Sequence, residues 1–523
     1  MRPLGRRTFL GNAALLGASA GLANLLPAWA QTASANTLSP SALSGSDIAL
    51  TVGRTHLDVD GRMGHAVAIN GTVPAPLIRL RQGQNVRLSV TNALDEDTSI
   101  HWHGVLAPHQ FDGVPSLSFP GIRPRETFVY DFPIVQSGTY WYHSHSGLQE
   151  QEGHYGPIII DPSGADPIAY DREYVVVLSD FSFMHPHLIF ERLKQQSGYF
   201  NMQRQTAADL LAGRGQSLND RMQWAGMRMD PTDISDVTGS TYTFLINGHG
   251  PRDNWTALFQ PGERVRLRFI NAAAMTLFNV RIPGLPLEIV QADGQNVKPV
   301  TVDEFQISIA ETFDAIVHPT EDRAFTLVAE AVDRSGMGRA TLAPHAGMTA
   351  EVPPLRPRPL ANMRDMGMDM SGMSMSRPGA DMSGNHGEHA SGSGASMNMD
   401  GMNMSMRNPA NAPQVVMGPG VQTISPMPVD RTGEPGQGLE NVGHRVLVYT
   451  DLEALDPNPD TRPPSRALEL HLTGNMERFM WSFDGQRYSE VTAPIPFRRD
   501  QRVRVPLLND SMMSHPIHTP GHF

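Results

Sequence analysis

Cysteine is absent from this chain of 523 residues, and its absence excludes several kinds of chemistry at once. Without a thiol there are no disulfides, no thiolate nucleophiles and no metal sites built from cysteine. Positive charge is also scarce, since 41 Lys and Arg stand against 53 Asp and Glu, giving a formal net charge of −12. Phosphate contact requires basic surface and no patch rich in Lys and Arg occurs, which argues against broad nucleic-acid binding.

A chain of this length is too long for one hydrophobic core, so we expect about two to four domains. The 42 Pro and 48 Gly predict many turns, and an apolar fraction of 40% is ordinary for a soluble globular protein. Methionine is abundant instead of cysteine, with 28 residues.

Residues 1–30 have the pattern of an export signal and are left out of the fold prediction. The pair Arg6-Arg7 precedes an apolar run over residues 13–26 that is too short to span a membrane. Ala28-Trp29-Ala30 then has the small-x-small form of a cleavage site. The pair matches a twin-arginine signal, so we predict a periplasmic protein with no membrane span after signal removal. The alternative is an ordinary secretion signal.

The remainder predicts an all-β protein made of three β-sandwich domains. Short apolar or alternating runs broken by Gly, Pro, Asn and Asp fill residues 45–165, 170–346 and 439–523. Residues 188–211 form one helical insert in the second region. Residues 347–438 are a Met-rich linker, whose central part, 363–406, has too few other apolar residues to form a core.

An internal repeat supports three related domains. A turn-and-strand pattern recurs and is followed each time by an asparagine four or five residues later, which indicates repeated domains because the period is about 180–240 residues. The three copies are residues 82–88 with Asn92, residues 261–267 with Asn271, and residues 499–505 with Asn509.

Two short strings in the first domain point to a metal site. On a strand, residues i and i+2 face the same side, so His101-Trp102-His103 and His143-Ser144-His145 each place two imidazoles on one face. Two such strands side by side would present four nitrogen donors, which suit copper, iron or zinc. A third pair, His185 and His187, flanks a proline that interrupts a strand ladder, and we favour no site there. Near the end of the chain, His515-Pro516-Ile517-His518 adds two more imidazoles.

These strings resemble a known family. His101-Trp102-His103-Gly104, Asp112-Gly113-Val114-Pro115 and Trp141-Tyr142-His143-Ser144-His145 are similar to the first-domain copper motifs of multicopper oxidases. Residues 146–151, 227–233, 282–285 and 472–478 resemble the periplasmic copper-resistance branch of that family.

The resemblance implies cupredoxin-like domains, copper as cofactor, and a three-copper cluster at which dioxygen is reduced to water. It implies a proton-delivering role for Asp112, whose alternative is a turn-forming aspartate before glycine. The implied copper ligands are His101 and His518 at the type 2 copper, His103, His143 and His145 at the type 3 coppers, and His515 at the type 1 copper.

The sequence departs from the family at its end. The family pattern HxxHxH requires histidine at position 520, where this chain has Pro520, and the later HCHxxxH string is absent from a sequence that stops at Phe523. We therefore expect an incomplete third domain and a type 1 site that this chain cannot complete. His522 is not expected to substitute, because Pro520 and Gly521 would have to turn the chain back on itself.

Thioether sulfur is a soft, uncharged donor that selects Cu(I), so the methionine clusters of the linker are candidate Cu(I) ligands. The alternative is a solvated linker, although linkers are usually built from Ser, Gly, Pro and charged residues. The candidates are Met366, Met368, Met370, Met373, Met375, Met397, Met399, Met402, Met404 and Met406, with His386 and His389 between the two clusters.

The sequence is compatible with two functions. The first is a periplasmic copper-resistance oxidase that oxidises Cu(I) or phenolic substrates and reduces dioxygen to water. The alternative is an oxidase-inactive protein that sequesters copper, because the type 1 cysteine and the last cluster histidines are missing. A cupredoxin-type reductase is disfavoured because it also needs the thiolate.

We predict that the 523-residue chain, purified and loaded with copper, consumes no dioxygen in the presence of a substrate. Extending it with an HCHxxxH string and placing histidine at position 520 should restore both the blue colour of a type 1 thiolate and oxygen consumption. Oxygen consumption by the unextended chain, followed with an oxygen electrode, would contradict this prediction.

Overall fold

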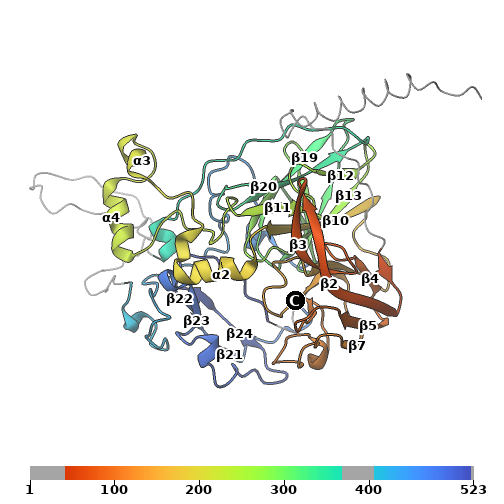
Figure 1. The fold of residues 1–523 in the computed structure, drawn as a ribbon, viewed down its shortest axis with the longest axis horizontal. Helices are drawn as coiled ribbons and strands as arrows, with labels where there is room; N and C mark the ends of the chain where they lie inside the picture. Colours follow the sequence, from red (N-terminus) through yellow and green to blue (C-terminus); the bar gives the residue numbers. More distant parts are fainter. Residues whose placement is uncertain (1–41, 368–405, 520–523) are drawn as a thin grey trace, which may run out of the picture.

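The computed structural model describes residues 42–367 and 406–519. The predicted export signal therefore lies outside the described residues, as do Pro520, His522 and most of the methionine clusters. Strands account for most of the regular structure, which confirms the all-β prediction, and they form three units in chain order (Figure 1). No helix within the described ranges is long and apolar enough to cross a membrane.

The first unit is a sandwich of two sheets. Alternating exposed and buried residues along β2 and β5 give each strand one face toward the core, as a half-buried strand requires. The sheet that carries the predicted histidines has the order β1 (Leu43–Ser44), β4 (Ile78–Arg81), β9 (Tyr155–Asp161), β8 (Gly138–His143), β6 (His101–His103). The facing sheet has the order β3 (Arg62–Ile69), β2 (Asp47–Val59), β5 (Asn85–Asn92), β7 (Thr127–Pro133).

The second unit is a larger sandwich whose inner strands are buried along their whole length, β13 and β19 among them. One sheet has the order β11 (Tyr242–Ile246), β10 (Arg172–Ser182), β13 (Val265–Asn271), β18 (Thr312–Val317), β15 (Leu287–Ala292), β16 (Gln295–Val302). The other has the order β12 (Trp255–Leu258), β20 (Met337–Ala343), β19 (Phe325–Ala331), β14 (Phe278–Arg281), β17 (Glu304–Ile307).

Helices form an insert between β10 and β11, where the sequence predicts helix over residues 188–211. The structure has α2 (Pro186–Gln195) and α3 (Ala207–Leu211) there, and it continues to α4 (Leu218–Met227), which lies beyond the predicted span. Helix α4 buries only Trp224, so it lacks the apolar stripe that would have identified it from sequence. Helix α2 buries Ile189 and Leu193, and its Lys194 Nζ donates to the Phe479 carbonyl of the third unit at 2.8 Å.

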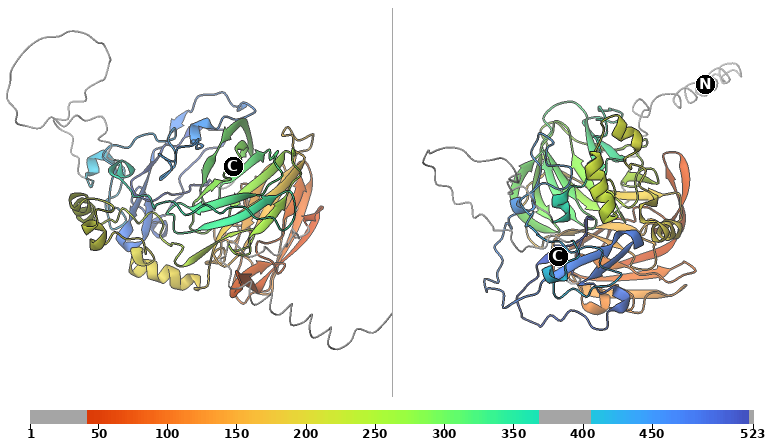
Figure 2. Two further views of the ribbon diagram at one scale, coloured as in Figure 1. Left: turned by 90° about the horizontal axis from the view of Figure 1, so that it is seen from above. Right: turned by 90° about the vertical axis from the view of Figure 1, so that its left-hand side faces the viewer.

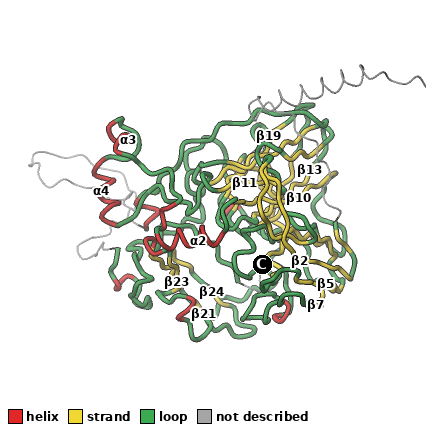
Figure 3. The backbone as a smooth tube through the Cα atoms, viewed as in Figure 1, coloured by secondary structure: helices red, strands yellow, loops and turns green. Residues whose placement is uncertain are grey.

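The third unit consists of short strands joined by long loops (Figure 3). Its paired strands are β21 (Arg466–Ala467) with β24 (Val503–Arg504), and β23 (Met480–Phe483), β22 (Leu470–Asn475), β25 (Leu507–Asn509). Single turns of 3-10 helix occur at His109–Phe111, Ser197–Tyr199, Met363–Met366, Pro409–Asn411, Tyr449–Asp451, Met476–Arg478 and Tyr488–Glu490. The three units lie against one another (Figure 2). Residues of all three line a common cavity, the central cavity.

The repeat found in the sequence corresponds to a repeated hydrogen-bonding pattern. In each copy the asparagine closes the loop that follows its strand. The side-chain oxygen of Asn92, Asn271 and Asn509 accepts from the backbone N–H two residues on, at 2.9–3.0 Å. The side-chain amide donates to a backbone carbonyl four or five residues on, at 2.6–2.9 Å.

The two ends of the Met-rich segment differ from the sequence prediction, which expects no core between residues 363 and 406. Both ends pack into one apolar cluster between the second and third units, because methionine side chains fill irregular gaps and contact aromatic rings favourably. The cluster contains Met363, Met366, Met406, Met476, Met512, Met513, Met227, Met229, Trp224, Trp481, Ile234 and Ala361.

A buried ionic group joins the first unit to the second. Asp314 on β18 is fully buried and accepts hydrogen bonds from Arg266 at 2.8 Å, from Arg268 at 3.0 Å and from the Thr139 hydroxyl at 2.7 Å. Thr139 lies on β8, and its backbone N–H donates to Gln291 of the second unit at 3.0 Å. The strand that carries His143 is thus fixed to the second unit.

We predict that Asp314→Ala lowers the free energy of unfolding by about 3–5 kcal/mol, because two buried guanidinium groups lose their shared partner. Urea titration followed by circular dichroism measures the change. Glu321→Ala is the matched control, since Glu321 pairs with Arg323 at the surface and such pairs contribute about 1 kcal/mol or less. Equal small changes in both variants would contradict a structural role for Asp314.

Candidate metal centre

The predicted histidines of the first domain come together because β6 and β8 are antiparallel neighbours. In their register His101 lies opposite His143, and His103 lies opposite Trp141. The intervening Trp102 and Tyr142 point into the core of the first sandwich, so the imidazoles point to the other face, as strand alternation requires.

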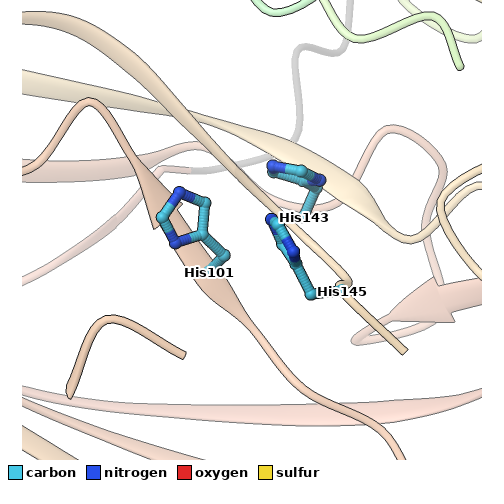
Figure 4. A group of neighbouring side chains, drawn as sticks. All are labelled: His101, His143 and His145. Carbon is cyan, nitrogen blue, oxygen red and sulfur yellow. The ribbon is translucent and has the colours of Figure 1, made fainter. Parts of the chain in front are cut away.

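The imidazoles form two overlapping groups. Ligand nitrogens of His101, His143 and His145 lie within 4.8 Å of one another, and the three rings face a common space (Figure 4). A second group with the same limit joins His101 and His103 to His518 of the third unit. The structure thus brings together five of the six histidines assigned to copper in the sequence analysis.

His101 is held by its neighbours in one tautomer. Its Nδ1 lies 2.6 Å from the backbone oxygen of Asp112, which can only accept, so Nδ1 carries the proton and Nε2 is left as a donor to metal. The loop can approach this closely because Gly113 has φ +84°, and a Cβ there would lie 1.8 Å from the Ile100 oxygen. The Asp112 carboxylate lies 3.6 Å from the same Nδ1, and burial raises the pKa of that carboxyl.

His101 and His143 are buried, His103 is half-buried, and His145 and His518 are exposed, and some of the inner nitrogens lack the hydrogen bonds that buried polar groups normally make. Within residues 42–367 and 406–519, both nitrogens of His143 and Nδ1 of His103 find no hydrogen-bond partner. Leaving a buried donor or acceptor unsatisfied costs about 1–3 kcal/mol, so such groups call for an explanation. Trp141 stacks on the His143 ring at 4.0 Å and fixes its plane.

Burial also keeps these rings neutral. It lowers the pKa of His143 to about 3 and of His145 to about 4, and it holds the pKa values of His101 and His103 well below the ordinary value. A metal binds the neutral imidazole, so unprotonated rings with unpartnered nitrogens fit a copper centre.

The two histidines of the third unit occupy different positions. The ring of His518 stacks against that of His103, with centroids 4.1 Å apart. His515 instead lies beside Trp481 at 4.7 Å, with its Nε2 2.7 Å from the Ser511 hydroxyl, and it belongs to neither group of converging nitrogens among the described residues. Both histidines border the central cavity of about 1420 Å³.

Two groups near the centre were not identified from the sequence. His154 is completely buried, and burial together with the nearby His143 lowers its pKa to about 3. Glu150 Oε2 lies 3.4 Å from His143 Nδ1, and burial raises the pKa of this carboxyl to about 7. Both residues lie in the turn between β8 and β9, where no strand periodicity indicates which way a side chain points.

Some of the other histidine and methionine candidates lie in the part of the chain that the structure describes, and the rest lie outside it. His185 caps the N-terminus of α2, where its Nδ1 accepts from the His187 backbone N–H at 3.3 Å, so the pair lies at a helix start and not on a strand. Met366 and Met406 pack in the apolar cluster described above. Met368, Met370, Met373, Met375, Met397, Met399, Met402 and Met404 lie outside the described residues.

We predict that His143→Ala weakens copper binding by at least about 100-fold while the protein stays folded, because neither nitrogen of His143 supports the fold through a hydrogen bond. Copper content after gel filtration and thermal unfolding of the metal-free protein measure the two effects. His318→Ala, at an exposed imidazole that contacts only the Gly262 carbonyl, should change neither. A destabilised protein that still binds copper normally would contradict the assignment.

We predict that the metal-free protein loses stability relative to its His154→Gln variant as the pH falls from 6.5 toward about 3. The pKa of His154 is 6.5 in an unfolded chain and about 3 in the folded protein. Between these pH values the unfolded state therefore binds a proton that the folded state does not bind. Stability from the neutral ring is complete above pH 6.5 and declines below it. The difference between the two unfolding free energies, measured by urea titration at several pH values, should have this slope; a pH-independent difference would refute it.

The chain was compared with known proteins. Models of the multicopper oxidase family match residues 51–165, 173–352 and 461–523. Copper resistance protein A of Escherichia coli is 46% identical over 547 residues, covering 99% of this chain and 89% of the relative. A copper resistance protein A homologue of Pseudomonas syringae pv. tomato is 46% identical over 538 residues, with the same coverage.

Two solved structures are less similar to this chain, and the family assignment does not rest on them. A blue copper oxidase from Nitrosomonas europaea is 24% identical with a TM-score of 0.45, and covers 58% of this chain and 86% of its own. A laccase from Botrytis aclada is 24% identical with a TM-score of 0.47, and covers 62% of this chain and 57% of its own. With three matched cupredoxin-like domains and near-complete alignment to copper resistance protein A, the chain belongs to the multicopper oxidase family of oxidoreductases.

Proposed function

We propose that this protein is a periplasmic copper-resistance oxidase that, when completed by a type 1 thiolate that residues 1–523 do not supply, oxidises Cu(I) or phenolic substrates and reduces dioxygen to water. The observation that carries the proposal is the convergence of five imidazoles, of which His143 is buried and has no hydrogen-bond partner for either nitrogen within the described residues. The identity to copper resistance proteins over nearly the whole chain supports the same conclusion.

In this proposal His101, His103, His143, His145 and His518 hold copper, which would supply the redox chemistry of dioxygen reduction when bound. His101 is oriented by the Asp112 backbone oxygen, and Trp141 fixes the plane of His143. The walls of the first sandwich exclude water from the rings of His101 and His143, which keeps these two rings unprotonated.

Asp112 is the proposed holder of a proton beside this centre. Its carboxyl oxygen lies 3.6 Å from His101 Nδ1, and burial raises its pKa, which favours the protonated form compared with a surface aspartate. A carboxyl in that state can hold a proton beside His101 Nδ1, release it toward the centre and recover it from solvent. Its backbone oxygen also orients His101, so the residue combines a turn-forming role with the proposed chemical one.

The second candidate is copper sequestration without turnover. It is favoured by one observation: residues 1–523 contain no cysteine, so these residues supply no type 1 thiolate. In that case the methionines of the linker capture Cu(I) and the protein acts by stoichiometric binding.

Two variants of the gene separate these functions in copper-sensitive cells grown under copper stress. An oxidase depends on the imidazole centre, so His143→Ala should abolish tolerance, whereas deleting residues 368–405 should only reduce it. A sequestering protein depends on the thioethers, so the effects should be reversed. The deletion spares Met363, Met366 and Met406 because they pack in the apolar cluster.

Anaerobic titration of both purified variants with Cu(I) against a competing chelator provides the binding side of the same test. The deletion variant is expected to bind fewer Cu(I) ions than the intact chain. Unchanged Cu(I) stoichiometry would reduce the deleted segment to a linker, and full tolerance in the His143→Ala strain would refute the oxidase proposal.

A further inference from the structure

A second pair of imidazoles lies on the hairpin formed by β2 and β3, away from the buried centre. The two-residue turn Asp60-Gly61 has φ values of 55° and 82°, which is the type I′ geometry that fixes hairpin register. Counting from the closing pair, Val59 with Arg62, the register places His56 directly opposite His65.

This position brings side chains close together. In a two-residue hairpin the closing pair is hydrogen-bonded and the pairs then alternate, so His56 and His65 form a non-hydrogen-bonded pair, in which Cα atoms are about 4.5 Å apart. The ring centroids lie 4.9 Å apart with the planes tilted by 49°. Both side chains are exposed, and neither ring makes a hydrogen bond to any part of the chain that the structure describes.

The same face of the hairpin carries two further donors. Asp58 and Met63 lie opposite each other, two residues closer to the turn and on the same face as the two histidines. The Met63 side chain is 59% exposed. One Asp58 oxygen accepts from the Gly61 backbone N–H at 2.8 Å, which holds the carboxylate over the strand. Imidazole, carboxylate and thioether groups thus share one exposed surface.

The opposite face of the hairpin is fixed to the second unit. Val59 packs with Phe181 and Leu245, and the β2–β3 ribbon runs beside β11 (Figure 1). Gly64 permits this close approach, because a Cβ there would lie 2.6 Å from the Phe181 ring.

The turn itself is also anchored. The Asp60 carboxylate accepts from the backbone N–H groups of Arg252 and Asp253 at 2.8 and 3.0 Å. The ribbon that carries the two imidazoles is therefore rigid before any ligand arrives, which reduces the entropy cost of chelation.

We propose that His56 and His65 chelate a divalent first-row transition ion at the surface of the hairpin, with Cu(II) bound most tightly. Two preorganised imidazoles suit such ions, and affinity among them rises to a maximum at Cu(II). Water completes the coordination. The His185 and His187 pair differs, because His185 Nδ1 already accepts the capping hydrogen bond of α2 and its Nε2 lies 3.9 Å from Glu152.

The test is a Cu(II) titration of the full chain, after copper loading and desalting so that the buried centre is already saturated. His56→Gln and His65→Gln should each lose about one Cu(II) equivalent, or weaken its binding by about tenfold or more, because a chelate reduces to a single imidazole. The double variant should bind Cu(II) no more tightly than either single one. Electron paramagnetic resonance should show nitrogen couplings from two imidazoles in the intact protein and their loss in the variants.

His345→Gln is the matched control, since His345 is exposed and contacts only Asp322 at 3.4 Å. Unchanged melting temperatures should show that all variants are folded, as expected for exposed side chains. The proposal is overturned if His56→Gln and His65→Gln keep the stoichiometry and affinity of the intact chain, or if the control loses as much copper as they do. Because the buried centre is saturated beforehand, this outcome does not depend on the proposed oxidase function.

Discussion

The pairing of β6 with β8 is the contact on which the candidate centre depends. It sets His101 opposite His143, and strand alternation places His103 on the same side as His101. The pairing alone would not fix the position of His143 if β8 could shift relative to the second unit. Hydrogen bonds from Thr139 and Trp141 to the second unit fix its position, so a domain that contributes no histidine to the centre still determines where His143 lies.

The burial that forms the centre also costs folding free energy when no metal is bound. Several imidazole nitrogens are withdrawn from water and left without hydrogen bonds within the described residues, and the rings cannot recover the loss by binding protons because their pKa values are low. Local departures from good packing and hydrogen bonding of this kind are expected at functional sites, where binding of the missing partner offsets them. Metal affinity and this local cost to stability therefore have one physical origin.

Much of this could be predicted from the sequence because it depends on short-range periodicity. The HxH spacing on strands, the repeated turn-and-strand pattern and its asparagines all translate directly into geometry. The remainder depends on contacts between distant segments. His154 and Glu150 lie in a turn, where spacing says nothing about direction, and α4 has no apolar stripe. The packing of Met366 and Met406 could not be predicted from the sequence, because it depends on the second and third units meeting around these residues.

The three loop-closing asparagines have a consequence for how such a protein can be assembled. Each one makes hydrogen bonds within five residues of its own position, and the amides of Asn92 and Asn271 also donate to the distant carbonyls of Ile122 and Ile307. These distant partners lie in the same domain as the asparagine, so both kinds of contact are copied together when the domain is duplicated. Duplication of one ancestral sandwich could therefore produce three without redesigning this connection, and later specialisation could be confined to the faces where the copies meet.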